Sequence, residues 1–146
     1  MTHSSLSRAR RTAERPGARL LLPLETFATF PGIPVALSAV RRIVASAAAG
    51  CPRAEDLVLI ACEYATNTIR HSPSGQHGGE FTVRVQLAPG WARLEVGDSG
   101  DGDWAAAPPD PAAESGRGLI VVAALADKYG HQRGCAWAEV TCPSTL

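Results

Sequence analysis

The chain has little of several features that mark common function classes. Lys+Arg and Asp+Glu number 14 each among its 146 residues, so the formal net charge is zero. This balance argues against a uniformly basic nucleic-acid binder and against an acidic disordered chain. Aromatic residues make up only 5% of the chain, which argues against a base-stacking surface. No hydrophobic run approaches the ~20 residues that span a bilayer. We therefore expect no direct nucleic-acid partner and no membrane partner.

The four cysteines lack the spacing of a metal site. Cys51, Cys62, Cys135 and Cys142 form no CxxC pair, and no histidine lies at zinc-finger spacing from them. At this chain length, buried reduced thiols are more common than a disulfide framework. We therefore expect reduced cysteines and a cytoplasmic protein.

Hydrophobic periodicity predicts a single α+β domain. Helices are expected over residues 34–49, 53–71 and 116–126, a first strand over 20–30, an antiparallel hairpin over 80–97, and a last strand or pair over 129–141. This order predicts a two-layer α/β sandwich, in which helices cover one face of a mixed, mostly antiparallel sheet.

The remaining segments are expected to lie outside this core. Residues 1–17 contain several arginines and are expected to form a mobile basic tail before a single domain over 18–146. The Leu20–Leu24 segment imitates a secretory signal, but it is too short and Glu25 interrupts it. The Pro/Ala-rich stretch over 103–115 is long for a connection, which favours a lid.

The second expected helix carries a polar stripe, Glu63-x-x-x-Asn67-x-x-x-His71. A spacing of four places all three side chains on one helix face. An Asn oxygen suits Mg²⁺, which prefers oxygen ligands and keeps several waters. A carboxylate one turn earlier can deprotonate a nucleophile. Taken alone, the pattern is more typical of a solvated helix face that ends in a capping histidine.

Two glycine-containing motifs follow, within a cluster of nine glycines between Gly75 and Gly118. Asp98-Ser-Gly100-Asp-Gly102 comes directly after a strand, where a carboxylate can accept a hydrogen bond from an exocyclic amine. Gly116-Arg117-Gly118-Leu119 opens a helix, whose free N–H groups favour phosphate. Alone, the first is also an ordinary turn and the second an ordinary helix start.

The three motifs in this order resemble the ATPase fold shared by gyrase, the Hsp90 chaperone and histidine kinases, the GHKL superfamily. Within it, Glu63-Tyr-Ala-Thr-Asn67-Thr-Ile-Arg-His71-Ser72 and the segment from Gly116 to Asp127 are most similar to the stand-alone anti-sigma factor and switch-protein serine kinase group. The resemblance extends from about Leu24 to Val140.

The resemblance implies a role for each matching residue. Asn67 falls at the Mg²⁺ ligand and Glu63 at the proposed catalytic base. Asp98 falls at the acceptor of the adenine amine, with Gly100 and Gly102 shaping the pocket. The phosphate-binding helix start contains Gly116, Arg117, Gly118 and Leu119. The implied cofactors are ATP and Mg²⁺.

The resemblance also implies a function. It favours an ATP-binding regulatory protein that acts as a serine/threonine protein kinase and phosphorylates an anti-anti-sigma-like partner in a partner switch. A sigma factor would be held through another surface, and a homodimer is allowed because relatives often dimerise. The alternative is a module that sequesters a regulatory protein, either as an ATP-binding domain with weak catalysis or without nucleotide.

The chain departs from the group at the start of the last strand. Many relatives have a Gly-Lys-Thr/Ser-like sequence there, whereas this chain has Arg133-Gly134-Cys135-Ala136. The lysine and the hydroxyl are therefore missing from this turn.

Overall fold

Residues 23–98 and 116–143 are described here by a computed structural model. The elements in chain order are β1 (Leu24–Pro31), the 3-10 helix η1 (Pro34–Ala36), α1 (Leu37–Ala47), α2 (Ala54–His71), the 3-10 helix η2 (Pro73–Gly75), β2 (Glu80–Ala88), β3 (Gly90–Asp98), α3 (Gly116–Leu125), β4 (Lys128–Gln132) and β5 (Cys135–Cys142). The tail predicted over 1–17 and the lid predicted over 103–115 lie outside these residues.

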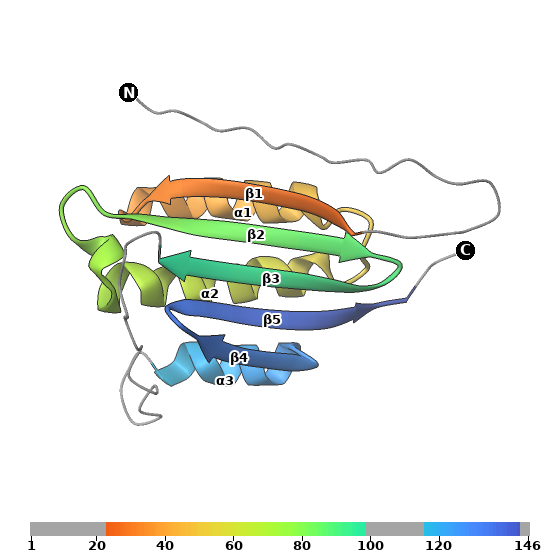
Figure 1. Cartoon of the computed structure of the whole chain (residues 1–146). Coiled ribbons are helices and arrows are strands. Elements are labelled where there is room, and N and C mark those ends of the chain that lie inside the picture. The colour runs from red at the N-terminus through yellow and green to blue at the C-terminus, as the bar shows by residue number, and fades with distance from the viewer. Residues whose placement is uncertain (1–22, 99–115, 144–146) are drawn as a thin grey trace.

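The strands form one five-stranded sheet in the order β1-β2-β3-β5-β4 (Figure 1), and each of its four pairings is antiparallel. The predicted hairpin is confirmed as β2 and β3, with Ala88 opposite Trp91. Gly90 closes the turn at a φ of 91°, a left-handed conformation that favours glycine. The predicted last pair is confirmed as β4 and β5, and β5 returns beside β3.

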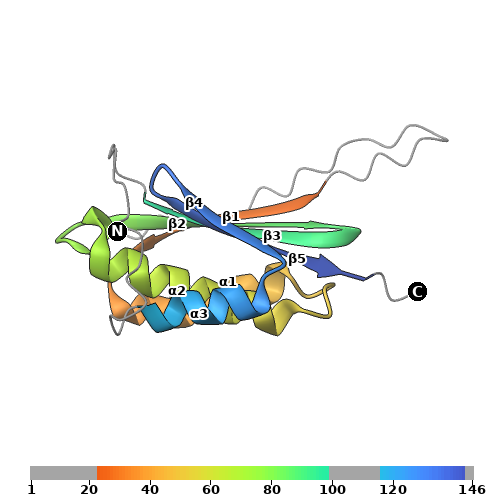
Figure 2. The same ribbon diagram turned by 90° about the horizontal axis from the view of Figure 1, so that it is seen from below.

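The three α-helices cover one face of the sheet (Figure 2), which confirms the predicted two-layer α+β sandwich. Side chains alternate along β2, so Phe81, Val83 and Val85 are buried beneath the helices while Thr82 and Arg84 are only half-buried. α2 lies between α1 and α3 and contacts β3. None of the described helices has the length and hydrophobicity of a membrane span.

α2 packs through one continuous stripe. Its buried residues follow helical spacing and are Leu57, Ile60, Ala61, Tyr64, Ala65 and Thr68. Each large apolar side chain buried in this way contributes about 1.5–3 kcal/mol. The Tyr64 hydroxyl donates a hydrogen bond to the Trp137 carbonyl at 2.8 Å, and burial raises the pKa of this hydroxyl. The stripe fixes the rotation of α2 about its axis.

The face of the sheet away from the helices carries charges that pair across strands. Arg93 bonds to Glu95 at 3.0 Å and to Glu139 at 2.7 Å. Its guanidinium also lies 4.4 Å from the centre of the Trp137 ring. Arg84 continues the series by pairing with Glu95 at 3.5 Å. The charged side chains on this face therefore pair with one another.

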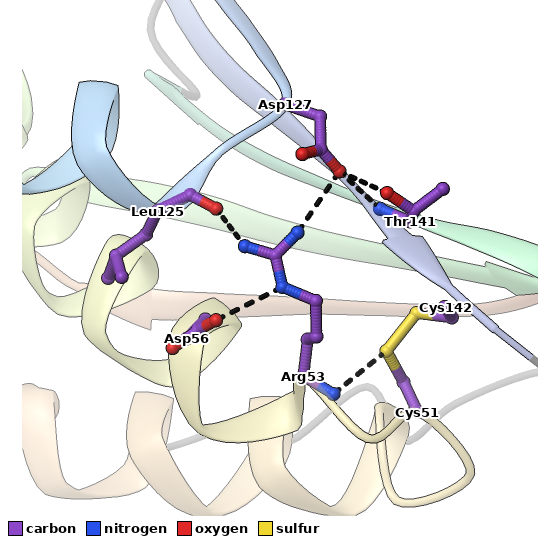
Figure 3. Close-up of polar contacts among 7 residues, drawn as sticks. All are labelled: Cys51, Arg53, Asp56, Leu125, Asp127, Thr141 and Cys142. Atoms are coloured by element: carbon purple, nitrogen blue, oxygen red, sulfur yellow. Dashed lines mark hydrogen bonds and ion pairs between the residues drawn. A yellow bond between two sulfur atoms is a disulfide. The ribbon is translucent and has the colours of Figure 1, made fainter.

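Arg53 joins three elements where α2 begins (Figure 3). Its Nε lies 3.1 Å from Asp56, its Nη1 lies 3.0 Å from Asp127, and its Nη2 donates to the Leu125 carbonyl at the end of α3. The Asp127 carboxylate also accepts from the N–H (2.6 Å) and the hydroxyl of Thr141. These bonds from Thr141, together with the charge of Arg53, lower the pKa of Asp127.

A disulfide joins Cys51 to Cys142 beside Arg53 (Figure 3). The expectation of reduced thiols is wrong for this pair, whereas Cys62 and Cys135 are free. The two bonded cysteines are 91 residues apart, and folding brings their Cα atoms to 5.2 Å, within the range of a disulfide. The cytoplasmic location, which depended on reduced thiols, stays a prediction.

We expect reduction of this disulfide to destabilise the fold. A bond that closes so long a loop restricts the unfolded chain and stabilises the native state by about 2–4 kcal/mol. Cys142→Ser should therefore lower the free energy of unfolding by that amount in denaturant titrations. Reductant should do the same to the wild type but have no further effect on the variant.

Cys62→Ser is the matched control, because it removes a thiol outside the disulfide and should keep the response to reductant. Thiol titration should find two thiols in the oxidised wild type and four in the reduced wild type. Equal unfolding midpoints for these two forms would contradict the expectation.

Candidate functional site

Glu63 and Asn67 lie one turn apart on α2, beside its buried stripe. Both are half-buried, because the residues that follow them, Tyr64 and Thr68, take the positions facing the core. No side-chain hydrogen bond or ion pair engages either of them within residues 23–98 and 116–143. Of the predicted polar stripe, Glu63 and Asn67 therefore border the core and are available for a ligand, whereas His71 is exposed at the end of α2.

The first turn of α3 packs directly on Glu63. A Cβ added to Gly118 would lie 2.5 Å from Glu63 Oε2 and 3.4 Å from its Cδ. Such contact distances are possible only because residue 118 has no side chain. The Glu63 carboxylate thus lies against backbone at a helix start, where N–H groups have no intrahelical partners. Two of the three predicted motifs are brought together here.

Asp98, from the third motif, is the last residue of β3. Its N–H donates to the Gly134 carbonyl at 3.0 Å, and its Oδ1 accepts a hydrogen bond from the Ser74 hydroxyl at 2.6 Å. Ser74 belongs to η2, which directly follows α2. The end of β3, the end of α2 and the start of α3 therefore lie at the same end of the sheet (Figure 1).

The comparison with known families identifies this arrangement. A model of the histidine kinase-like ATPase domain matches residues 30–141. The chain belongs to this family. A search of curated proteins finds no match. Membership of the family implies that the domain binds ATP, which agrees with the nucleotide site predicted from the three motifs.

The structure describes only part of the remaining predicted site residues. Gly100 and Gly102 lie outside the described residues. The backbone of Gly116 and Arg117 forms the start of α3, but the Arg117 side chain is not described. Leu119 is half-buried in the same turn. The binding roles assigned to these residues stay predictions.

The donors of the ATPase domain fit a magnesium ion that arrives with a nucleotide. Across the described ranges, no group of three His, Cys, Asp or Glu side chains could hold a metal alone. Mg²⁺ in nucleotide sites is held by one or two protein oxygens, by phosphates and by water. The Asn67 amide oxygen, one turn from the Glu63 carboxylate, is a donor of this kind.

Sequence reasoning missed one residue that bonds to this site. The sequence Ser72-Pro73-Ser74-Gly75 predicts only a break after the second helix, yet Ser74 is 1% exposed and contacts Asp98. The only signal in the sequence is a pair of serines in a short turn. Such a turn is as common on a surface as in a site, so the contact became visible only in the fold.

We expect Gly118→Ala to separate stability from binding. Alanine favours a helix over glycine by about 1 kcal/mol, and the atom it meets is the flexible end of the Glu63 side chain. Tm should therefore stay equal or rise. The methyl group would displace the carboxylate and occupy backbone that phosphates approach, so calorimetry should show ATP binding about tenfold weaker or worse.

Gly50→Ala is the control, because its added Cβ would meet only Leu87 Cδ2 at 3.5 Å, an ordinary contact. ATP binding by Gly118→Ala at the wild-type level would contradict the placement of phosphates at this turn.

Proposed function

We propose that this domain is an ATP-dependent protein serine/threonine kinase that acts on a partner protein in a regulatory switch. The observation that carries the proposal is the contact between the Glu63 carboxylate and the start of α3 at Gly118. The Glu63 carboxylate, which we propose as the general base, lies beside the backbone proposed to bind phosphates and one turn before the proposed magnesium ligand Asn67. A domain that only binds a nucleotide does not require this carboxylate.

The chain's own residues divide the binding of ATP among three elements. Asp98 at the end of β3 would accept a hydrogen bond from the adenine amine. Backbone N–H groups in the first turn of α3 would bind the phosphates. Asn67 would hold Mg²⁺ through its amide oxygen. When bound, Mg²⁺ offsets the charge of the phosphates during transfer.

Glu63 would then take the proton from a serine or threonine hydroxyl of the partner. The hydroxyl oxygen attacks the γ-phosphorus of ATP. The bond between the γ-phosphorus and the β-γ bridging oxygen breaks, and ADP leaves with that oxygen. The partner gains a phosphoryl group of about −1.5 to −2 charge. Added charge of this size would weaken docking and release the partner.

The partners that fit this scheme are an anti-anti-sigma-like protein as the phosphate acceptor and a sigma factor held through another surface. Homodimerisation and a cytoplasmic location complete the proposal. The partners and the homodimer rest on the resemblance of residues 63–72 and 116–127 to the anti-sigma and switch-kinase group. The contact between Glu63 and Gly118 supports phosphoryl transfer but does not distinguish one protein partner from another.

A second candidate, a sequestering module with little or no phosphoryl transfer, is favoured by Cys135. This residue begins β5, in the stretch that lacks the lysine and the hydroxyl of many members of the group. Burial, followed by the nearby charge of Glu95, raises the pKa of the Cys135 thiol. A neutral thiol is a weaker hydrogen-bond donor than a hydroxyl, so this turn would contribute less to a bound nucleotide.

We expect Mg-ATP to raise the Tm of the wild type by several degrees, because a ligand that binds only the native state stabilises it. Asn67→Ala should lose the magnesium-dependent part of this shift. Gln86→Ala, which removes an amide side chain from β2, should keep it. A wild type with no shift at millimolar Mg-ATP, or an Asn67→Ala shift equal to that of the wild type, would count against the site.

We expect Glu63→Gln to stop transfer but keep binding. The amide is isosteric but cannot take a proton, so transfer of γ-labelled phosphate to a partner captured from the native cell should fall about 10²–10⁴-fold. Calorimetric ATP affinity should change little. Glu55→Gln, in the exposed first turn of the same helix, should match the wild type. Undiminished labelling by Glu63→Gln would rule out the base, and ATP binding without wild-type labelling would favour the sequestering module.

A further inference from the structure

A relay of hydrogen bonds connects the end of α2 to Asp98. The Ser72 hydroxyl donates to the Thr68 carbonyl at 2.6 Å and accepts from the Ser74 N–H at 3.0 Å. The Ser74 hydroxyl then donates to Asp98 Oδ1 at 2.6 Å. Ser72 is 7% exposed and Ser74 is 1% exposed. Buried hydroxyls with these partners have few alternative rotamers.

Two glycines allow other segments of backbone to pack closely against this turn. A Cβ on Gly32, just after β1, would lie 1.6 Å from the Ser74 carbonyl oxygen. A Cβ on Gly75 would lie 1.7 Å from the carbonyl oxygen of Ile69 in α2. Both contacts are with backbone, which cannot move aside as a flexible side chain can. The turn is therefore wedged between the end of β1 and the last turns of α2.

Asp98 is held by hydrogen bonds to both its backbone and its side chain. The backbone at Asp98 is fixed by the hydrogen bond from its N–H to the Gly134 carbonyl. The carboxylate is fixed by Ser74, through an O–H···O⁻ bond of the short, strong kind.

We infer that Ser74 is a positioning residue that sets the preference of this site for adenine by orienting the Asp98 carboxylate. The inference rests on the proposed function, in which Asp98 accepts a hydrogen bond from the adenine amine. Binding geometry must hold within about 0.5 Å to be productive. A carboxylate released from Ser74 would rotate and lose the amine, while the phosphate-binding backbone of α3 would be unchanged.

The test compares two nucleotides that differ only in the group Asp98 would read. Purine riboside triphosphate lacks the exocyclic amine of ATP and keeps the ribose and phosphates. The wild-type chain should bind ATP more tightly than this analogue. Ser74→Ala should weaken ATP binding by roughly tenfold and change the affinity for the analogue less than about twofold. Calorimetry with Mg²⁺ measures both affinities, and Tm reports on folding.

Two further variants keep the test decisive. Ser74→Cys keeps the shape of the side chain, with a larger atom and a poorer donor in place of the hydroxyl, so its preference for ATP should lie between those of the wild type and Ser74→Ala. It also serves if Ser74→Ala does not fold. Thr82→Ala removes a hydroxyl that bonds to the Gly97 carbonyl rather than to Asp98. This control should keep the wild-type preference.

The outcomes separate this inference from the proposed function. Equal weakening of ATP and analogue in the Ser74 variants would mean a general structural role and would overturn the inference. An unchanged preference would overturn it as well, and in both cases ATP binding by the wild type would stand. A wild type with no preference for ATP would refute the role of Asp98 first, and the role of Ser74 with it.

Discussion

The packing of α2 on the sheet is the constraint on which the rest of the structure depends. Its stripe from Leu57 to Thr68 is buried along the whole helix, so the rotation of the helix cannot change without exposing apolar surface. With the rotation fixed, Glu63 and Asn67 are directed beside the core, where Gly118 meets the Glu63 carboxylate. The candidate site is therefore a consequence of hydrophobic burial on the adjacent face of the same helix.

The two ends of this helix are secured by different chemistry. At its start, Arg53 and the Cys51–Cys142 disulfide join α2, α3 and β5 by side-chain bonds. At its end, glycines at positions 32 and 75 allow backbone to pack on backbone around Ser74. The first arrangement restrains the fold far from the ligand. The second brings rigid backbone and the Ser74 hydroxyl to Asp98. A binding site needs such support, because its side chains must keep a fixed position.

Most of the fold could be predicted from local patterns. The alternation in β2 and β3 and the helical spacing in α2 gave elements whose bounds differ from the structure by a residue or two. The first strand, expected over 20–30, is β1 from Leu24 to Pro31, and its expected residues 20–22 lie outside the described part of the chain. The disulfide was predicted wrongly, since nothing local to Cys51 indicates a partner 91 residues away. Ser74 was missed for the same reason, because its partner Asp98 is on another element.

By itself, the sequence determined the elements, the family, and the identity of the polar side chains on each helix face, because periodicity and motif spacing are properties of neighbouring residues. Only the tertiary structure decided which motifs meet. It packed Gly118 on Glu63, placed Asp98 on the turn after α2, and joined Cys51 to Cys142. These contacts depend on how the helices lie on the sheet, and that arrangement is set by burial of the whole core at once rather than by any single segment.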